Sequence, residues 1–382
     1  MQILILGGDG YLGWPTAMHL SSIGHKVAVV DNYLRRDLML KEDIEPLYST
    51  PNLSERVKIW KEISGHDIEL FVGDLNDWNF VSSIFKKTLP EAIVHYAEQP
   101  SAPYSMLRRE TATLTLKNNI MVTANIIFAV REFCPDAHIV KLGTMGEYGT
   151  PNIDIEEGWI NINHNGRKDQ FLFPRQSGSL YHTTKIMDTD LLWFYVRVWG
   201  LKVTDLMQGP VYGVFTTETE LDTRLATTFT YDEIFGTVLN RFIVQAVAGY
   251  PLTVYGKGGQ TRGYINIRDT INCIKLSIEN PAEKGQLRVF NQFTETFSVN
   301  DLAFKIQSVS RKLGFDVSIK KLKNPRKELE EHYYNPKHSG LTELGLTPNF
   351  LDEEELKKMF EFVLLYKKNI NINKIFSGYK WD

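Results

Sequence analysis

Residues 2–31 read QILILGGDGYLGWPTAMHLSSIGHKVAVVD, and this stretch decides the fold. An apolar strand over residues 2–6 leads into four glycines, and a helical pattern from Pro15 to Ile23 ends at Gly24. A second apolar strand follows and ends at Asp31. Strand, glycine turn, helix and strand in this order begin a doubly wound α/β sheet. We therefore predict a Rossmann-type parallel sheet with a smaller C-terminal α/β domain that binds substrate.

The glycine spacing Gly7-x-x-Gly10-x-x-Gly13 allows a tight turn and lets backbone amides approach a pyrophosphate at a helix N-terminus. Asp31 follows Gly13 at the interval expected of an acid that binds the adenosine ribose. A βαβ turn without a ligand is the alternative. The acid favours NAD over NADP, because a carboxylate repels a 2′-phosphate. The residues expected to hold NAD are Gly7, Gly10, Tyr11, Leu12, Gly13, Asp31, Asn32, Arg35, Arg36, Asp74, Leu75, Tyr181 and Lys185.

Arg35 and Arg36 leave a second interpretation open for the adenosine end. Their guanidinium groups are able to accept a 2′-phosphate, which would favour NADP. They are equally suited to clamping the pyrophosphate or to covering a solvated face. Asp31 carries more weight, so the sequence predicts NAD.

A second informative stretch, residues 141–185, carries the candidate chemistry. Thr144 follows an apolar strand, and Tyr181 and Lys185 are four residues apart, on one face of the helix expected to follow. An ammonium beside a phenol lowers the pKa of the phenol. A Thr hydroxyl, an activated Tyr and a Lys suit the oxidation of a substrate alcohol to a ketone. A Tyr-x-x-x-Lys spacing alone often occurs by chance on the surface of a helix. The upstream glycine motif supports a functional role for it here.

The bulk composition is that of a globular enzyme. The chain has 382 residues, of which 43% are hydrophobic and 23% charged, and a net charge of −3 gives no basic surface for nucleic acid. No apolar run is long enough for a membrane helix, and no signal peptide is evident. Two cysteines, Cys134 and Cys273, provide neither a disulfide framework nor a zinc site, so we expect no metal. We expect a cytoplasmic protein.

The rest of the chain is divided by pattern into residues 1–207, the NAD-binding domain with the Thr/Tyr/Lys group, and residues 208–382, which bind mainly the sugar nucleotide. Some segments of the second part are expected to return to the Rossmann core. Residues 37–67 read as an insertion of unknown role, and residues 150–178 as a long loop in the pocket wall. The expected substrate-binding residues are Gln99, Asn119, Thr144, Gln208, Thr253, Tyr255, Arg262 and Arg326.

With these pieces assembled, the sequence resembles the extended short-chain dehydrogenase/reductases that act on nucleotide sugars. Within them it is most similar to the UDP-sulfoquinovose synthases. The resemblance covers about residues 2–350. It rests on GGDGYLGW at 7–14, KLGTMGEYGTPNIDIEEG at 141–158, VYGKGGQTRGY at 254–264 and EEHYYN at 330–335.

The resemblance implies that UDP-glucose and sulfite form UDP-sulfoquinovose while NAD stays bound. It implies that Tyr181, assisted by Lys185, takes the 4-hydroxyl proton and that Thr144 holds that oxygen. Glu147 and His182 are the candidates for the base and acid at C5 and C6, and Met145 shapes the cavity beside them. A homodimer or higher homo-oligomer is expected, with no nucleic acid and no membrane as partner.

Two alternatives remain at this point. The first is a UDP-glucose 4-epimerase or a related nucleotide-sugar dehydratase on the same scaffold. A dehydratase is expected to carry Asp-Glu after the catalytic Thr, whereas Met145-Gly146 follows here. The second is a dinucleotide-sensing binding protein without catalysis, and the presence of both Tyr181 and Lys185 argues against it.

Overall fold

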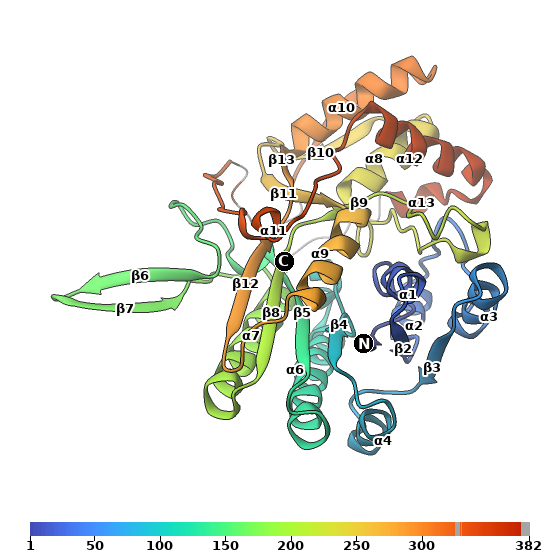
Figure 1. Cartoon of the computed structure of the whole chain (residues 1–382). Coiled ribbons are helices and arrows are strands. Elements are labelled where there is room, and N and C mark those ends of the chain that lie inside the picture. Colours follow the sequence, from blue (N-terminus) through green and yellow to red (C-terminus); the bar gives the residue numbers. More distant parts are fainter. Residues whose placement is uncertain (325–328, 330, 376–382) are drawn as a thin grey trace.

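The computed structural model describes residues 1–324, 329 and 331–375. Its centre is a seven-stranded sheet in which every neighbouring pair of strands is parallel (Figure 1). The strand order is β12-β8-β5-β4-β1-β2-β3. The strands are β1 (Gln2–Leu6), β2 (Lys26–Asp31), β3 (Ile68–Val72), β4 (Ala92–His95), β5 (His138–Thr144), β8 (Lys202–Gln208) and β12 (Leu287–Gln292).

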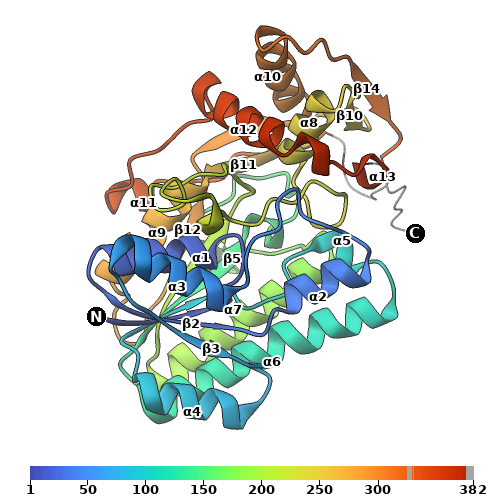
Figure 2. The same ribbon diagram turned by 90° about the vertical axis from the view of Figure 1, so that its right-hand side faces the viewer.

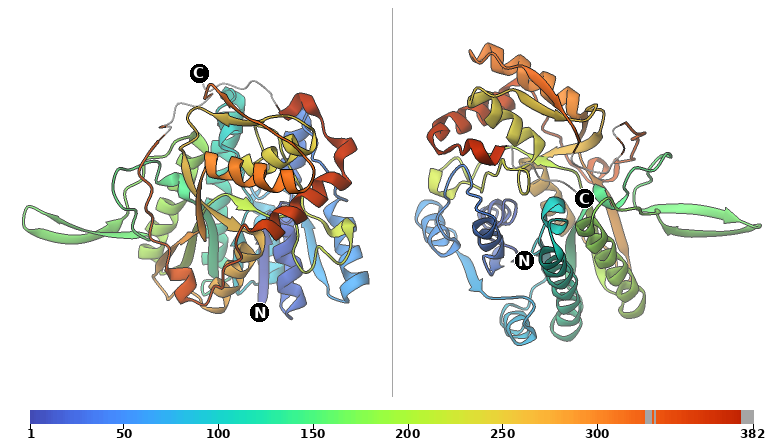
Figure 3. Two further views of the ribbon diagram at one scale, coloured as in Figure 1. Left: turned by 90° about the horizontal axis from the view of Figure 1, so that it is seen from above. Right: turned by 180° about the vertical axis from the view of Figure 1, so that it is seen from behind.

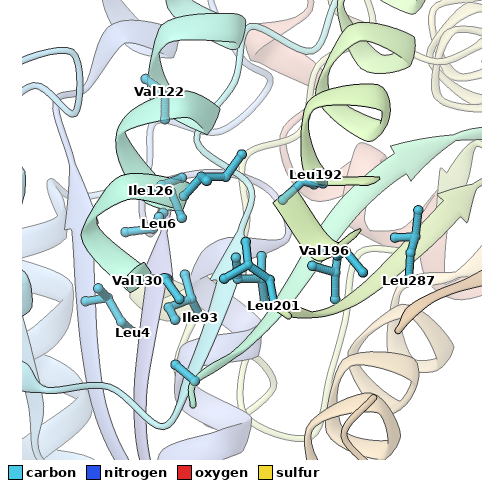
Figure 4. Close-up of a cluster of buried hydrophobic side chains, with 14 of the residues drawn as sticks. Leu4, Leu6, Ile93, Val122, Ile126, Val130, Leu192, Val196, Leu201 and Leu287 are labelled. Carbon is cyan, nitrogen blue, oxygen red and sulfur yellow. The ribbon is translucent and has the colours of Figure 1, made fainter. Parts of the chain in front are cut away.

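Side chains alternate between the two faces of this sheet, and each face has its own apolar core. Leu4 and Leu6 pack on one face, where Figure 4 shows them with Ile126 and Leu192 of two covering helices, whereas Ile3 and Ile5 pack on the other. The first face is covered by α4 (Trp78–Thr88), α6 (Arg109–Phe133) and α7 (Leu180–Trp199). The second is covered by α1 (Gly13–Ser22), α3 (Leu53–Ser64) and α9 (Ile267–Glu279). The doubly wound fold class predicted from the sequence is confirmed.

The strand order reverses direction between β1 and β4. In an open parallel sheet, ligands bind outside the carboxyl ends of the strands at such a switch point. Elements of the second half of the chain lie above these ends in Figure 1, and several of their residues line the cavity there.

These elements share a third apolar core. They include two small sheets, β10-β14 and β13-β11-β9, and three long helices (Figure 2). Their bounds are β9 (Val211–Tyr212), α8 (Val238–Val247), β10 (Leu252–Tyr255), β11 (Thr261–Asn266), β13 (Glu295–Ser298), α10 (Val299–Lys312), β14 (Ile319–Leu322) and α12 (Glu353–Leu365). Shorter elements are α2 (Leu34–Lys41), α5 (Ala102–Ser105), η1 (Met145–Glu147), η2 (Thr223–Leu225), α11 (Gly340–Glu343), η3 (Lys367–Asn369) and α13 (Ile372–Ile375).

The expected loop 150–178 contains an antiparallel hairpin, β6 (Trp159–His164) and β7 (Arg167–Leu172). It projects from the body of the molecule (Figure 3). The expected insertion 37–67 contains part of α2 and all of α3. Because β12 belongs to the main sheet, a segment of the second half does enter the Rossmann layer. The division into domains at residue 207 stays a prediction.

Among the described residues, no helix is long and apolar enough to cross a membrane. Nor does that part of the chain bring together three or more His, Cys, Asp or Glu side chains in a way that suits a metal ion.

Candidate active site

The glycine turn between β1 and α1 has the close backbone approach that a pyrophosphate requires. A Cβ on Gly13 would lie 2.0 Å from the carbonyl oxygen of Gly7, and Gly7 itself has a φ of +91°. Side chains at these positions would therefore clash or strain the backbone. The turn leaves the N-terminus of α1 open to the cavity, and Gly7, Gly10, Tyr11, Leu12 and Gly13 all line it. This local geometry fits the pyrophosphate of a dinucleotide.

The adenosine end lies beyond β2 and β3. One oxygen of Asp31 accepts a hydrogen bond from the backbone N of Asp9 (2.8 Å) and the other from that of Tyr33 (2.7 Å). Burial raises the pKa of Asp31 to about 6. The remaining predicted adenosine contacts, Asn32, Asp74 and Leu75, line the same cavity.

This raised pKa leads to a prediction about pH. A ribose hydroxyl donates to the carboxylate and less well to the neutral acid, so NAD binding favours ionised Asp31. NAD affinity should therefore fall as the pH drops through 6, and we expect a Kd about fivefold higher near pH 5 than near pH 7.5. Titration calorimetry checks this, with Asp31→Asn as the variant that should lose the dependence. A Kd independent of pH in the unmodified protein would contradict a contact between Asp31 and NAD.

Arg35 and Arg36 line the cavity, but both guanidinium groups already contact the protein. Arg36 makes a bidentate pair with Asp9 (2.6 and 2.9 Å). Arg35 lies 4.1 Å from the centre of the Phe235 ring. Arg36 is thereby bound to a carboxylate in the glycine turn, an arrangement unfavourable for accepting a 2′-phosphate. Direct contact of either arginine with NAD stays a prediction.

The predicted Thr/Tyr/Lys group comes together at the carboxyl end of β5. Thr144 ends that strand, and Tyr181 and Lys185 lie one turn apart at the start of α7. Thr144 and Tyr181 line the cavity, whereas Lys185 lies behind them. The Lys185 ammonium donates to the Leu142 carbonyl oxygen (2.6 Å) and pairs with Glu98 (2.5 Å).

The expectation that a neighbouring Lys185 lowers the pKa of Tyr181 is wrong for this state of the site. The pKa of Tyr181 is raised, first by burial and then by the carboxylate of Glu98, and Lys141 opposes the rise. Because Glu98 is the ion-pair partner of Lys185, it offsets the effect of the ammonium on the phenol. The sequence argument considered the helix alone and omitted the loop that faces it.

Glu147 does not line the cavity, which corrects its predicted role in proton transfer. Its carboxylate is fully buried, lies 3.4 Å from the Lys141 ammonium and 3.6 Å from Arg175, and accepts from the backbone N of Thr144 (3.3 Å). The short η1 turn after β5 points the side chain inward. Glu147 is therefore a positioning residue beneath Thr144.

Glu147→Gln should reduce the free energy of unfolding by about 3 kcal/mol, since it removes one charge from a buried ion cluster. Asp205 still pairs with Lys141 (3.2 Å), which keeps the loss at the lower end of the usual range. Urea unfolding measures the change. Glu156→Gln, at an exposed neighbouring position, is the matched control and should change stability little. If the variant keeps its stability but loses product formation, Glu147 takes part in the reaction itself.

His182 and Met145 lie at the cavity wall beside Tyr181. The imidazole packs against Gly146, where a Cβ would come within 2.3 Å of His182 Nε2. The rings of Tyr181 and His182 are 5.3 Å apart between their centres. With Glu147 buried, His182 is the member of the predicted acid–base pair that reaches the cavity.

At the opposite end, the structure brings together Gln208, Tyr255 and Arg262 from β8, β10 and β11. Thr253 does not line the cavity: its hydroxyl accepts from the amide of Gln245 (2.7 Å), so direct substrate contact is not supported. Arg326 lies outside the described residues.

Asn119 and Gln99 organise the loop after β4. The Asn119 amide bridges the backbone of Gln99 (2.9 and 3.2 Å) to the Thr184 hydroxyl (3.0 Å), and Asn119 does not itself line the cavity. The Gln99 side chain donates to the Ser101 carbonyl oxygen (3.0 Å). Both residues position the loop on α7, and substrate contact by Gln99, at the cavity wall, stays a prediction.

Three features of the cavity were not predicted. Glu98 faces Lys185, and Arg241 of α8 lies 4.7 Å from the centre of the Tyr255 ring. Part of the insertion, residues 42–51, supplies wall residues of the cavity, and the backbone N of Leu47 donates to the Phe229 carbonyl oxygen (2.9 Å). In the sequence, Arg241 is a charged residue near the start of a predicted helix. Because such residues usually face solvent, its position gave little indication that its side chain would reach the cavity.

Both ends belong to one cavity of about 1690 Å³. Single drug-sized ligands occupy about 300–1,000 Å³. The volume therefore suits a dinucleotide and a second ligand of similar size held together, with Thr144, Tyr181 and His182 between them.

Comparisons with known proteins agree with this geometry. The model of the NAD dependent epimerase/dehydratase family matches residues 3–291. The chloroplastic UDP-sulfoquinovose synthase of Spinacia oleracea is 48% identical over 380 residues, which cover 100% of this chain and 79% of that protein. The UDP-sulfoquinovose synthase of Sulfolobus acidocaldarius is 46% identical, covering 97% and 94%.

Solved structures share the fold. UDP-glucose 4-epimerase from Thermotoga maritima with UDP-glucose has a TM-score of 0.70 at 21% identity, over 96% of this chain and 99% of that one. UDP-glucose 4-epimerase from Bifidobacterium longum, in complex with NAD+ and UDP, has a TM-score of 0.72 at 16% identity, over 97% and 100%.

A parallel sheet with a glycine cradle at its switch point and a Thr–Tyr–Lys group at the next strand end defines an NAD-dependent enzyme of the epimerase and dehydratase class. The two relatives at 48% and 46% identity narrow the class of enzyme. This chain belongs to the NAD-dependent epimerase/dehydratase family and, within it, to the UDP-sulfoquinovose synthases.

Proposed function

We propose that this enzyme converts UDP-glucose and sulfite into UDP-sulfoquinovose and water, with NAD held through the whole cycle. The observation that carries the proposal is the single cavity in which Thr144, Tyr181 and His182 lie between the glycine cradle and a second ligand end that contains Arg262. The near full-length similarity to two UDP-sulfoquinovose synthases supports the same conclusion.

In the first step Tyr181, as the phenolate, accepts the proton of the sugar 4-hydroxyl, and the Thr144 hydroxyl donates to the same oxygen. The positive charge of bound NAD⁺ would oppose the effects of burial and Glu98 and would lower the pKa of Tyr181. Bound NAD supplies the hydride acceptor for this oxidation and the donor for the final reduction. Lys185 lies behind Tyr181, where its ammonium, held by Glu98 and the Leu142 carbonyl oxygen, keeps the start of α7 against β5.

The 4-ketone makes the C5 proton acidic. His182 removes that proton and passes it to the C6 hydroxyl, which leaves as water and gives a 5,6-ene conjugated with the ketone. The sulfur lone pair of bisulfite then adds to C6, and the proton that bisulfite releases is delivered to C5 by His182. In the last step Tyr181 returns its proton to O4. Atoms and electrons balance because the C6–O bond is replaced by a C6–S bond and the oxidation at C4 is reversed.

The direct test is incubation of the purified protein with UDP-glucose and ³⁴S-labelled sulfite, with products read by mass spectrometry. A labelled UDP-sulfoquinovose that requires both substrates is the expected result. UDP-galactose formed without sulfite would identify an epimerase instead. The absence of any product, with NAD reduced by UDP-glucose, would show that the sulfur donor is another compound and would overturn the role of free sulfite.

We also propose that the protein forms a homodimer through α6 and α7. These helices lie side by side (Figure 1) and expose apolar side chains from both, which suits a helical interface between two copies. The exposed residues are Leu116, Met121, Phe128, Met187, Phe194 and Val198. Sedimentation equilibrium of the purified chain distinguishes a dimer from a monomer.

We further propose a cytoplasmic location. Cys134 and Cys273 are both free thiols, and burial raises the pKa of each to about 12. Unreactive free thiols suit a reducing compartment. Cell fractionation with an antibody to the protein tests the proposal.

A further inference from the structure

Glu98 is a buried acid that faces the active site. Its side chain is 2% exposed and lines the cavity, with Oε1 2.5 Å from the Lys185 ammonium and 3.5 Å from His95. Oε2 has no hydrogen-bond partner among the residues that the structure describes. Burying an ionised carboxylate in this way is unfavourable in free energy unless an opposite charge nearby compensates it.

The sheet order places Glu98 at the nicotinamide end of the cofactor site. Strand β4, which leads into Glu98, lies between β1, which carries the glycine cradle, and β5, which carries Thr144. The adenosine residues lie on the other side, beyond β2 and β3. Glu98 therefore lies between the pyrophosphate cradle and the residues that act on the sugar.

We propose that Glu98 balances the charge of Lys185 and thereby keeps the bound cofactor in its oxidised form between turnovers. The oxidised nicotinamide ring carries a positive charge and the reduced ring does not. An uncompensated Lys185 would repel the oxidised ring and favour the reduced one. With Glu98 in place the pair is neutral, and the oxidised ring meets no net repulsion.

The other charges around this pair agree with the assignment. Asp188, His95 and Lys141 are also fully buried near Lys185. Burial and the Glu98 carboxylate raise the pKa of Asp188 well above its usual range. Burial and the two lysines lower the pKa of His95 well below its ordinary value, so this imidazole is neutral. Glu98 is thus the carboxylate that opposes Lys185.

The inference deepens the proposed function and rests on its internal redox cycle. An enzyme that oxidises and then reduces the same sugar must begin each cycle with oxidised cofactor. If an intermediate escaped, the reduced form would remain and the enzyme would stop. A site that favours the oxidised form makes return of the hydride to C4 more favourable.

The experiment measures the affinities of the full-length chain for NAD⁺ and NADH separately, by titration calorimetry. Glu98→Gln should raise the ratio of Kd for NAD⁺ to Kd for NADH by about tenfold, equal to a rise of about 30 mV in the potential of the bound couple. Lys185→Gln should lower the ratio by a similar factor, and the double variant should return close to the unmodified value. Glu132→Gln, an exposed acid that does not line the cavity, is the control and should not change the ratio.

Shifts of the Kd ratio in opposite directions in the two single variants support the proposal. A loss of packing would not change the direction of the shift according to the charge that is removed. Shifts in the same direction, or a Glu98→Gln ratio within twofold of the unmodified protein, overturn it. Glu98→Asp keeps the charge and should retain the original ratio; a shift there equal to that of Glu98→Gln also overturns it. Since neither sugar nor sulfite is present, this outcome is independent of whether the proposed reaction is correct.

Discussion

Tyr181→Phe is expected to lower sulfosugar formation by about 100-fold or more, because it removes the group that takes and returns the proton at O4. The phenol lines the cavity beside Thr144. The backbone N of Tyr181 donates to the Ser105 hydroxyl (3.1 Å), and phenylalanine keeps that bond and the ring packing. The effect should therefore appear in chemistry and not in folding.

The measurement is reduction of bound NAD by UDP-glucose without sulfite, followed at 340 nm in a single turnover. This first half-reaction should slow by the same factor as the complete reaction. Tyr195→Phe, on the same helix but away from the cavity, is the control and should retain the normal rate. A Tyr181→Phe enzyme with a near-normal rate would exclude Tyr181 as the proton acceptor.

His182→Gln should show a different pattern, in which sulfosugar formation falls about 100-fold while UDP-glucose still reduces the bound NAD. Oxidation at C4 needs Tyr181 and Thr144, whereas removal of the C5 proton needs a base on the neighbouring wall. His182 reaches that wall and Glu147 does not. The variant should therefore accumulate absorbance at 340 nm and release no product.

Deuterium incorporation gives a second measurement of the same step. In D₂O without sulfite, the unmodified enzyme should exchange the C5 hydrogen of UDP-glucose for deuterium, and His182→Gln should not. His164→Gln, at an exposed position in the β6–β7 hairpin, is the matched control. Normal exchange and normal sulfonation in His182→Gln would place the base elsewhere in the cavity.

The sequence predicted the parts of this site that depend on local spacing. The glycine turn, Asp31, and the pairing of Tyr181 with Lys185 follow from residues close together in the chain, and backbone geometry places them. The fold class follows from the same stretch, because alternating strands and helices leave few arrangements.

The features that could not be predicted from the sequence depend on the direction in which a side chain points or on partners far away along the chain. Glu147 stands in a motif with Thr144, yet the η1 turn carries it under the strand to Lys141 and Arg175. Glu98 appears as one polar residue in a polar loop, and only α7 brings Lys185 to it. Sequence spacing along one helix therefore gave the wrong direction for the pKa of Tyr181.

The strand β12 was missed for a related reason, since its sequence includes polar residues and its partner β8 lies far earlier in the chain. This pairing has a consequence for biosynthesis. During translation β8 emerges long before β12, and until then it presents an open sheet edge able to pair with another nascent chain. Chains truncated before residue 287 should therefore aggregate, and completion of the sheet must await synthesis of most of the protein.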